Sequence, residues 1–481
     1  MTDTRTEIQS VKPYSGPAWL VLALTCACQF MVILDVSIVN VALPSVQHDL
    51  GFTDTGLAWV VNGYVLAFAG FMLLGGRAAD LFGHRRMMVA GLGLFSLASL
   101  AAGLASTPEI LVGARAAQGL GGAMLAPATL AVINTCFPEG PERVRAFGAW
   151  SASGGIGGMV GAVAGGVLTT GLSWRWVFLI NVPIGVVLVA VAMRSLTAAQ
   201  GGRRESMDLL GAVTGTAGLA SVIYGVMQTA DHAWGSAGVL VPILGGVLLL
   251  AVFLLVEKRF ATAPTIPLRL LTNRGVAVSN AMLLLFGGIA IAMWFFSSLL
   301  MQNVLQYSAL ETGLGQTPAA IMFVVVARFG VGWLPRTGVR SLILAGCACF
   351  VVGFGWLSQA GTGSHYVASV LGPTLLVAMG IGLVFPTLMA SATADVPPGD
   401  AGIAGGLANT ASQAGGSIAL AVYATAAAAR AAAPKGASSS AEALASGYEL
   451  VFELAAAVAV AIVVVSLLLP RRQQSRMATT D

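Results

Sequence analysis

One acidic residue, Asp35, lies deep inside a long apolar run and is the side chain best placed to do chemistry. The run begins near Pro17 and extends to Pro44. A carboxylate at membrane depth is costly unless it is paired or reaches water, so a functional role is the default hypothesis. With the spans placed as below, Asp35 is the only acid well inside one. We therefore expect Asp35 to bind and release a proton.

Arg115 is the expected partner of this acid. Asp35 precedes Pro44 by nine residues, about 13 Å of helix, and Arg115 follows Glu109 by six residues, about 9 Å. These depths permit an ion pair. Burial favours the neutral form of a carboxyl group and a nearby guanidinium favours the charged form, so a group balanced between them can exchange protons. The alternatives are a static ion pair or an acid that caps backbone groups.

A charged, glycine-containing turn from Gly75 to Arg86 is the second candidate. Positive charge beside a span sets topology, and that role alone explains its arginines. That role does not explain Asp80 or the spaced glycines, which suggest a further function for the turn. We expect ion pairs here to form a conformational gate, made by Gly76, Asp80, Gly83, Arg85 and Arg86.

Glycines spaced four apart form the third candidate. Gly157, Gly161 and Gly165 lie on one helix face, followed directly by Gly166. Such a flat face allows close helix packing in a membrane. The functional interpretation is that this face packs against the other half of the protein and seals a leak path; the alternative is ordinary close packing.

Polar and aromatic residues inside the predicted spans form the fourth candidate. Each alone is more often an interface anchor or a helix–helix hydrogen bond. Together they could line a cavity for a large, partly apolar molecule. They are Trp59, Asn62, Tyr64, Gln118, Trp294, Gln302, Asn409 and Gln413.

Several kinds of chemistry have no support in the sequence. A phosphate-binding G-x-x-x-x-G-K-[ST] loop is absent, so the chain cannot be its own ATPase. The histidines show no metal spacing, and no nucleophile stands with a base. We expect no enzymatic activity, no metal, no cofactor and no nucleic-acid partner. The cysteine pairs 26/28 and 347/349 are expected to be packing residues.

The composition is that of a polytopic membrane protein. Hydrophobic residues make up 57% of the 481-residue chain and charged residues only 9%, against about 25% in soluble domains. Apolar segments long enough to span predict an all-α integral membrane fold with fourteen transmembrane helices. They lie near 17–46, 56–76, 86–106, 110–133, 144–170, 176–195, 208–229, 239–256, 276–303, 312–333, 341–359, 366–391, 402–429 and 449–470.

The positions of Lys and Arg predict the orientation. With the N-terminus in the cytoplasm, the outer segments hold only Arg175, Arg430 and Lys435, and Arg115 and Arg328 lie within spans. The rest of the 24 basic residues fall on the cytoplasmic side, as the positive-inside rule expects. Both termini are therefore predicted to be cytoplasmic.

The chain also repeats itself. Gly83-His84-Arg85 recurs as Gly338-Val339-Arg340, 255 residues later, after the second helix of a six-helix set in each case. We predict two six-helix bundles at 17–195 and 276–470, separated by linker segments at 196–275 that contain two inserted helices, 208–229 and 239–256. Short cytoplasmic tails, 1–16 and 471–481, complete the chain. Two parallel halves around a midplane site are typical of a rocking transporter.

These stretches together resemble the major facilitator superfamily, specifically its fourteen-helix branch of drug/proton antiporters. The resemblance rests on LDVSIVNVALP at 34–44, WVVNGY at 59–64, the turn at 76–86, RAAQG at 115–119, the glycines at 157–166 and WRWVFLINVPIG at 174–185. Ala162 departs from it, because the branch usually has proline there.

The resemblance implies a major facilitator fold and a proton-coupled antiporter. It would export small organic molecules such as drugs or antibiotics from the cytoplasm by alternating access, driven by the proton gradient. We expect a monomer in the bilayer of a bacterial plasma membrane, with Asp35 and Arg115 coupling protons. Two alternatives stay open, an uptake symporter for a small organic solute and a lipid-handling or signalling membrane protein on the same fold.

Overall fold

The computed structural model consists of helices joined by short connections over the part of the chain that it describes, with no β-strand there. That part comprises residues 17–137, 141–196, 209–230, 232, 235–259, 268–330, 334–394, 396, 401–432 and 440–470. The predicted tails 1–16 and 471–481, and much of the linkers, lie outside it. Away from its ends, a regular helix bonds its backbone polar groups within itself, which is why apolar sequence folds this way in lipid.

The N-terminal half is built from seven helices, and a glycine or a cap residue marks several of their ends. Gly51, in the left-handed conformation, ends the first helix. Thr53 and Thr107 accept hydrogen bonds from the first turns of the second and fourth helices. The helices are α1 (Ala18–Leu50), α2 (Asp54–Phe82), α3 (His84–Gly103), α4 (Pro108–Cys136), α5 (Pro141–Gly171), α6 (Trp176–Leu179) and α7 (Asn181–Ser195).

The C-terminal half repeats the pattern with irregular stretches in two of its spans. Its elements are α11 (Arg274–Ile291), the π-helical η2 (Ala292–Phe296), α12 (Ser297–Leu299), the π-helical η3 (Leu300–Val304), α13 (Ala309–Gly330), α14 (Leu334–Leu357), the π-helical η5 (Val367–Leu371), α15 (Gly372–Thr393), α16 (Ala401–Ala432) and α17 (Ser440–Ser466). The elements from α11 to η3 form one continuous apolar span, Arg274–Val304.

Eleven helices of the described chain are long and apolar enough to cross a membrane. Shorter apolar stretches lie in α2 and α8, and α16 is a 32-residue helix with a less apolar sequence. Each of the fourteen predicted segments thus falls on helical structure. The exact number of crossings stays a prediction.

The duplicated motif has the same backbone in both halves. Gly83 has φ 91° and Gly338 has φ 78°, so both adopt a conformation that side-chain-bearing residues rarely take. Gly83 lies directly before α3 and Gly338 lies at a kink inside α14, and a basic residue, Arg85 or Arg340, follows two positions later in each case. The repeat seen in the sequence is therefore a repeat of a specific turn.

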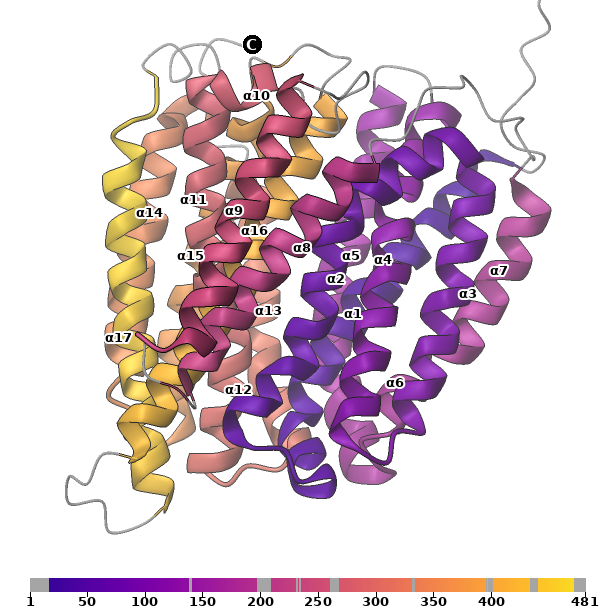
Figure 1. Cartoon of the computed structure of the whole chain (residues 1–481). Helices are drawn as coiled ribbons and strands as arrows, with labels where there is room; N and C mark the ends of the chain where they lie inside the picture. The colour runs from indigo at the N-terminus through magenta and orange to yellow at the C-terminus, as the bar shows by residue number, and fades with distance from the viewer. Residues whose placement is uncertain are drawn as a thin grey trace, which may run out of the picture.

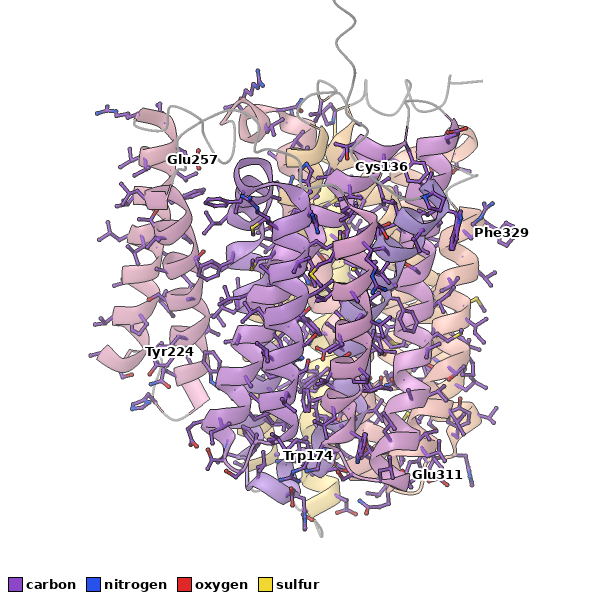
Figure 2. All side chains as sticks on the ribbon, turned by 90° about the vertical axis from the view of Figure 1, so that its right-hand side faces the viewer. Cys136, Trp174, Tyr224, Glu257, Glu311 and Phe329 are labelled. Atoms are coloured by element: carbon purple, nitrogen blue, oxygen red, sulfur yellow. The ribbon has the colours of Figure 1, made fainter. Side chains whose placement is uncertain are left out.

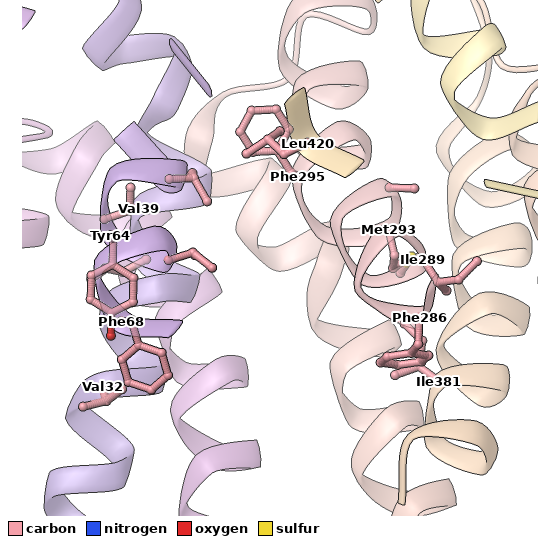
Figure 3. Close-up of a cluster of buried hydrophobic side chains, with 14 of the residues drawn as sticks. Val32, Val39, Tyr64, Phe68, Phe286, Ile289, Met293, Phe295, Ile381 and Leu420 are labelled. Carbon is pink, nitrogen blue, oxygen red and sulfur yellow. The ribbon is translucent and has the colours of Figure 1, made fainter. Parts of the chain in front are cut away.

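The two halves meet along two lines of contact. In one, α5 packs on α13, and in the other α2 packs on α16. Figure 1 shows the halves side by side, with the N-terminal half in indigo to magenta. The buried apolar side chains of both halves belong to one cluster, to which the N-terminal half contributes Val32, Val39, Tyr64 and Phe68 and the C-terminal half Phe286, Ile289, Met293 and Ile381 (Figure 3).

The inserted helices cover one of these lines of contact. α8 (Leu209–Met227) packs on both α2 and α16, whereas α9 (Ala237–Arg259) packs on α8 and on the short 3-10 helix η1 (Gln228–Ala230). Thr216 of α8 donates to the Gly70 carbonyl of α2 over 2.7 Å. The pair stands outside the bundle, with Tyr224 and Glu257 labelled on it in Figure 2. A fourth connecting helix, α10 (Leu268–Thr272), leads from there into α11.

Candidate functional site

Asp35 is held in the middle of the N-terminal half by three donors. Arg115 donates to its Oδ2 over 2.5 Å, and Gln118 and Asn181 donate to its Oδ1 over 3.0 Å and 2.9 Å. The carboxylate is fully buried and the Arg115 side chain is 1% exposed. The structure thus brings together the acid and the base whose depths matched in the sequence, and it closes this carboxylate off from solvent.

The Arg115 guanidinium is fixed by further contacts. Its Nε donates to the Val60 carbonyl over 3.0 Å, and Nη1 also donates to Gln118 Oε1 over 2.9 Å. The Tyr64 ring lies 4.4 Å from the guanidinium carbon and the Phe178 ring lies 5.8 Å away. Aromatic faces attract a desolvated cation, so these rings stabilise the charge of Arg115 together with Asp35.

Gln118 connects the ion pair to a further helix. Its amide nitrogen donates both to Asp35 and to Ser99 Oγ, the latter over 2.6 Å. The network therefore spans α1, α3, α4 and α7, and Arg115 links it to α2 through the Val60 carbonyl. We name Asp35, Ser99, Arg115, Gln118 and Asn181 the proton-site network.

Ser99 and Asn181 were not among the residues singled out from the sequence. Asn181 lies in the WRWVFLINVPIG segment, next to Pro183 at the start of α7. A polar amide at membrane depth, close to the start of a helix, was the sequence feature that could have identified Asn181. No such feature identified Ser99, since serines are common in membrane helices.

A fully buried ion pair constrains what the site can do. Removing one partner of such a pair costs about 3–5 kcal/mol because the other charge is left uncompensated. Protonation of the acid would have a similar consequence for the arginine, unless its surroundings rearranged. The arrangement can therefore couple a proton to a change of conformation.

The contact that Arg85 makes from the turn proposed as a gate lies within one half and not between the two halves. Arg85 donates to the Met193 carbonyl at the end of α7, over 2.7 Å, inside its own half. Arg86 is exposed, and Gly76 approaches Pro127 of α4. The side chain of Asp80 lies outside the described residues. The role of the turn as a gate stays a prediction.

The glycine face of α5 does not pack against the other half, and that prediction was wrong. A Cβ at Gly157 would lie 2.7 Å from the Phe30 carbonyl oxygen, and one at Gly165 would lie 2.8 Å from that of Ile38, both in α1. At Gly161 the neighbours are Ser37 and Leu34 of the same helix. Four-residue spacing selects one face of a helix but does not say which neighbour meets it.

Gly166 does meet the other half. A Cβ there would lie 2.6 Å from the Leu310 Cα atom at the start of α13. From the other side, a Cβ at Gly313 would lie 2.2 Å from the carbonyl oxygen of Ala162. Ala162 is the residue at which this sequence differs from the motif that it resembles. One residue of helix turns the side-chain direction by about 100°, which is why Gly166 faces α13 and Gly165 faces α1.

The eight proposed cavity residues lie in different places. Tyr64 and Gln118 belong to the Asp35 surroundings, and Asn62 is buried nearby in α2. The Trp59 ring packs on Tyr224 of α8, 6.2 Å away, and so faces the inserted pair.

The other four lie in the C-terminal half. Gln302 reaches α1, and the Trp294 carbonyl accepts from Gln316 over 3.3 Å. Asn409 contacts the Met72 sulfur across the halves, at 3.4 Å, and Gln413 lies one turn further along α16. The side-chain contacts therefore do not place all eight residues on one binding surface.

The family model described as Major Facilitator Superfamily matches residues 25–420. The cephamycin export protein CmcT of Amycolatopsis lactamdurans is 47% identical over 414 residues, 85% of each chain. The puromycin resistance protein pur8 of Streptomyces alboniger is 38% identical over 415 residues, 85% of this chain and 81% of that one.

Solved structures of similar fold have very different sequences. The crystal structure of the nucleoside transporter NupG aligns with a TM-score of 0.62 at 12% identity, covering 93% of this chain and 98% of that chain. At that identity the likeness concerns the fold alone.

Proposed function

The chain belongs to the major facilitator superfamily, and on this premise we propose that it is a proton-coupled antiporter that exports small organic molecules, antibiotics among them. The relatives named for cephamycin export and puromycin resistance support this direction of transport. We place it in the bacterial plasma membrane, as a monomer with both termini in the cytoplasm, and we expect no cofactor besides the proton gradient. The proton-site network is the observation on which the proposal rests.

In the proposed cycle, Asp35 alternates between two protonation states. As a carboxylate it holds Arg115 of α4 and Asn181 of α7 through direct hydrogen bonds. Once protonated it carries no charge, and its attraction for the guanidinium falls. Arg115 then depends on the Val60 carbonyl and the Tyr64 ring, and the helices around it shift.

Export follows if the two states face opposite sides of the membrane. A proton entering from outside would favour the state that takes up substrate in the cytoplasm, and its release inside would complete the cycle. A ligand or proton can shift such an equilibrium only by its difference in affinity for the two states. The buried ion pair provides such a difference for the proton.

Transport into inside-out membrane vesicles tests the proposal. We expect vesicles holding the chain to accumulate puromycin or a cephamycin when a proton gradient is imposed, and to stop when a protonophore is added. Asp35→Asn should abolish this accumulation while the protein still reaches the membrane. Asp49→Asn, which changes a half-exposed acid at the end of α1, is the matched control and should keep it.

Two results would contradict the proposal. Accumulation by right-side-out vesicles would indicate an uptake symporter. Transport by the Asp35→Asn variant that still responded to the gradient would remove the role given to the proton-site network.

A further inference from the structure

A proline inside α1 leaves a backbone carbonyl without its usual donor. Pro44 lies within the continuous helix Ala18–Leu50. Because proline has no N–H, the carbonyl four residues earlier, that of Asn40, loses its partner within the helix. Ser298 of α12 donates to this carbonyl across the two halves, with 3.3 Å between its Oγ and the oxygen. A side chain of the C-terminal half thus replaces the bond that the proline removed.

Gln302 makes a second contact of the same kind. Its amide donates to the Val41 carbonyl over 3.1 Å and to Ser298 Oγ over 3.1 Å. Ser298 lies in α12 between two π-helical stretches, and Gln302 lies in the second of them. Stretches of π-helix inside α-helices are frequent at functional sites, because they redirect side chains.

The surroundings of these bonds are apolar and tightly packed. Val41, Ala162 and Ala309, from α1, α5 and α13, form a small buried cluster at the same level. The close approaches of Gly166 and Gly313 lie beside it. Ser298 is fully buried, and hydrogen bonds in such an environment are stronger than in water. The halves are therefore closed together at this end of the bundle, where Trp174 and Glu311 lie (Figure 2).

We propose that Pro44, Ser298 and Gln302 form a latch that holds the two halves together at the Trp174 end and opens once in each transport cycle. Opening must break both cross-half bonds, and the Asn40 carbonyl then has no donor within its own helix. Asp35 lies on the same helix, six residues before Val41 and so about 9 Å away. As a step of transport, the latch rests on the proposed export function.

The distance between the halves tests the latch directly. Spin labels at Ser106→Cys, between α3 and α4, and Thr362→Cys, between α14 and η5, place reporters at exposed positions at the Trp174 end of both halves. The distance distribution is measured by pulsed electron resonance on the full chain, in a background free of native cysteines. Neither substrate nor a proton gradient is needed, so failure of the latch can be told apart from failure of the proposed function.

We expect Ser298→Ala to raise the ratio of long to short distances about two- to tenfold, the effect of one hydrogen bond. Ser298→Ala with Gln302→Leu should raise it further. Ser96→Ala removes a buried hydroxyl whose bond, to the Leu92 carbonyl, stays within α3, and it should leave the ratio unchanged. Unchanged distances in the double variant would overturn the proposal.

Pro44→Ala provides the sharper test. It restores the N–H that can donate to the Asn40 carbonyl within α1, so the Ser298 bond then contributes little to holding the two halves together. Ser298→Ala should then add little to Pro44→Ala, whereas it has its full effect when Pro44 is present. Fully additive effects would show that Ser298 acts without the freed carbonyl and would overturn the proposal.

Discussion

Arg85 and Arg340 occupy equivalent positions 255 residues apart, and each binds the end of the last helix of its own half. Arg85 donates to the Met193 carbonyl of α7 over 2.7 Å. Arg340 donates to the carbonyls of Leu467 and Ser466 at the end of α17, over 3.2 Å and 3.4 Å. A cation at a helix C-terminus is favoured by the free carbonyls there. The duplication has therefore preserved an interaction as well as a turn.

The first prediction concerns these arginines. Because each contact stays within one half, Arg85→Ala and Arg340→Ala should lower stability by about 1 kcal/mol or less, and Lys at either position should restore part of it. Thermal unfolding of the purified protein measures this. If Arg85→Ala left the unfolding temperature unchanged but shifted the distances between the halves, the turn would be a gate rather than a clamp.

The second prediction concerns the buried ion pair. Asp35→Asn leaves Arg115 without its counter-ion and should cost about 3–5 kcal/mol of stability. Adding Arg115→Gln removes the orphaned charge, so the double variant should recover part of that loss. Transport driven by the gradient should stay absent in both. A double variant no more stable than Asp35→Asn would indicate that the charge is compensated by another group.

The third prediction concerns the glycine face of α5. Gly157→Ala would place a methyl group 2.7 Å from the Phe30 carbonyl oxygen, so α1 and α5 must separate, at about 1–3 kcal/mol. Gly158→Ala is the matched control, because its nearest neighbour, Ile33, would lie at an ordinary 3.8 Å. Unfolding temperatures of the two variants give the comparison. Equal temperatures would contradict the close packing of the two helices.

The fourth prediction concerns Asn181. Asn181→Ala removes one of the three donors to Asp35 and should lower gradient-driven transport about tenfold, the scale of one hydrogen bond to a charged group. Asn303→Ala loses a 3.2 Å bond to Tyr448 that lies within the C-terminal half, and it should have a much smaller effect. Initial rates in inside-out vesicles measure both. Equal rates for the two variants would exclude Asn181 from the proton-site network.

Much of the architecture was readable from the sequence because it depends on local composition. Apolar length located the helices, and the match between Gly83 and Gly338 indicated the repeat. The depths of Asp35 and Arg115 follow from helix rise alone, so their proximity could be anticipated. Each of these features is a property of one segment or of two segments compared.

Tertiary structure decided which faces meet. It placed Asn181 and Ser99 around Asp35, turned Gly157, Gly161 and Gly165 towards α1 and Gly166 towards α13, and paired Trp59 with the inserted helices. It also brought Ser298 to the carbonyl that Pro44 frees, a contact between residues 258 positions apart. Hydropathy and spacing describe one helix at a time, whereas the rotation of a helix in a bundle is set by all its neighbours together.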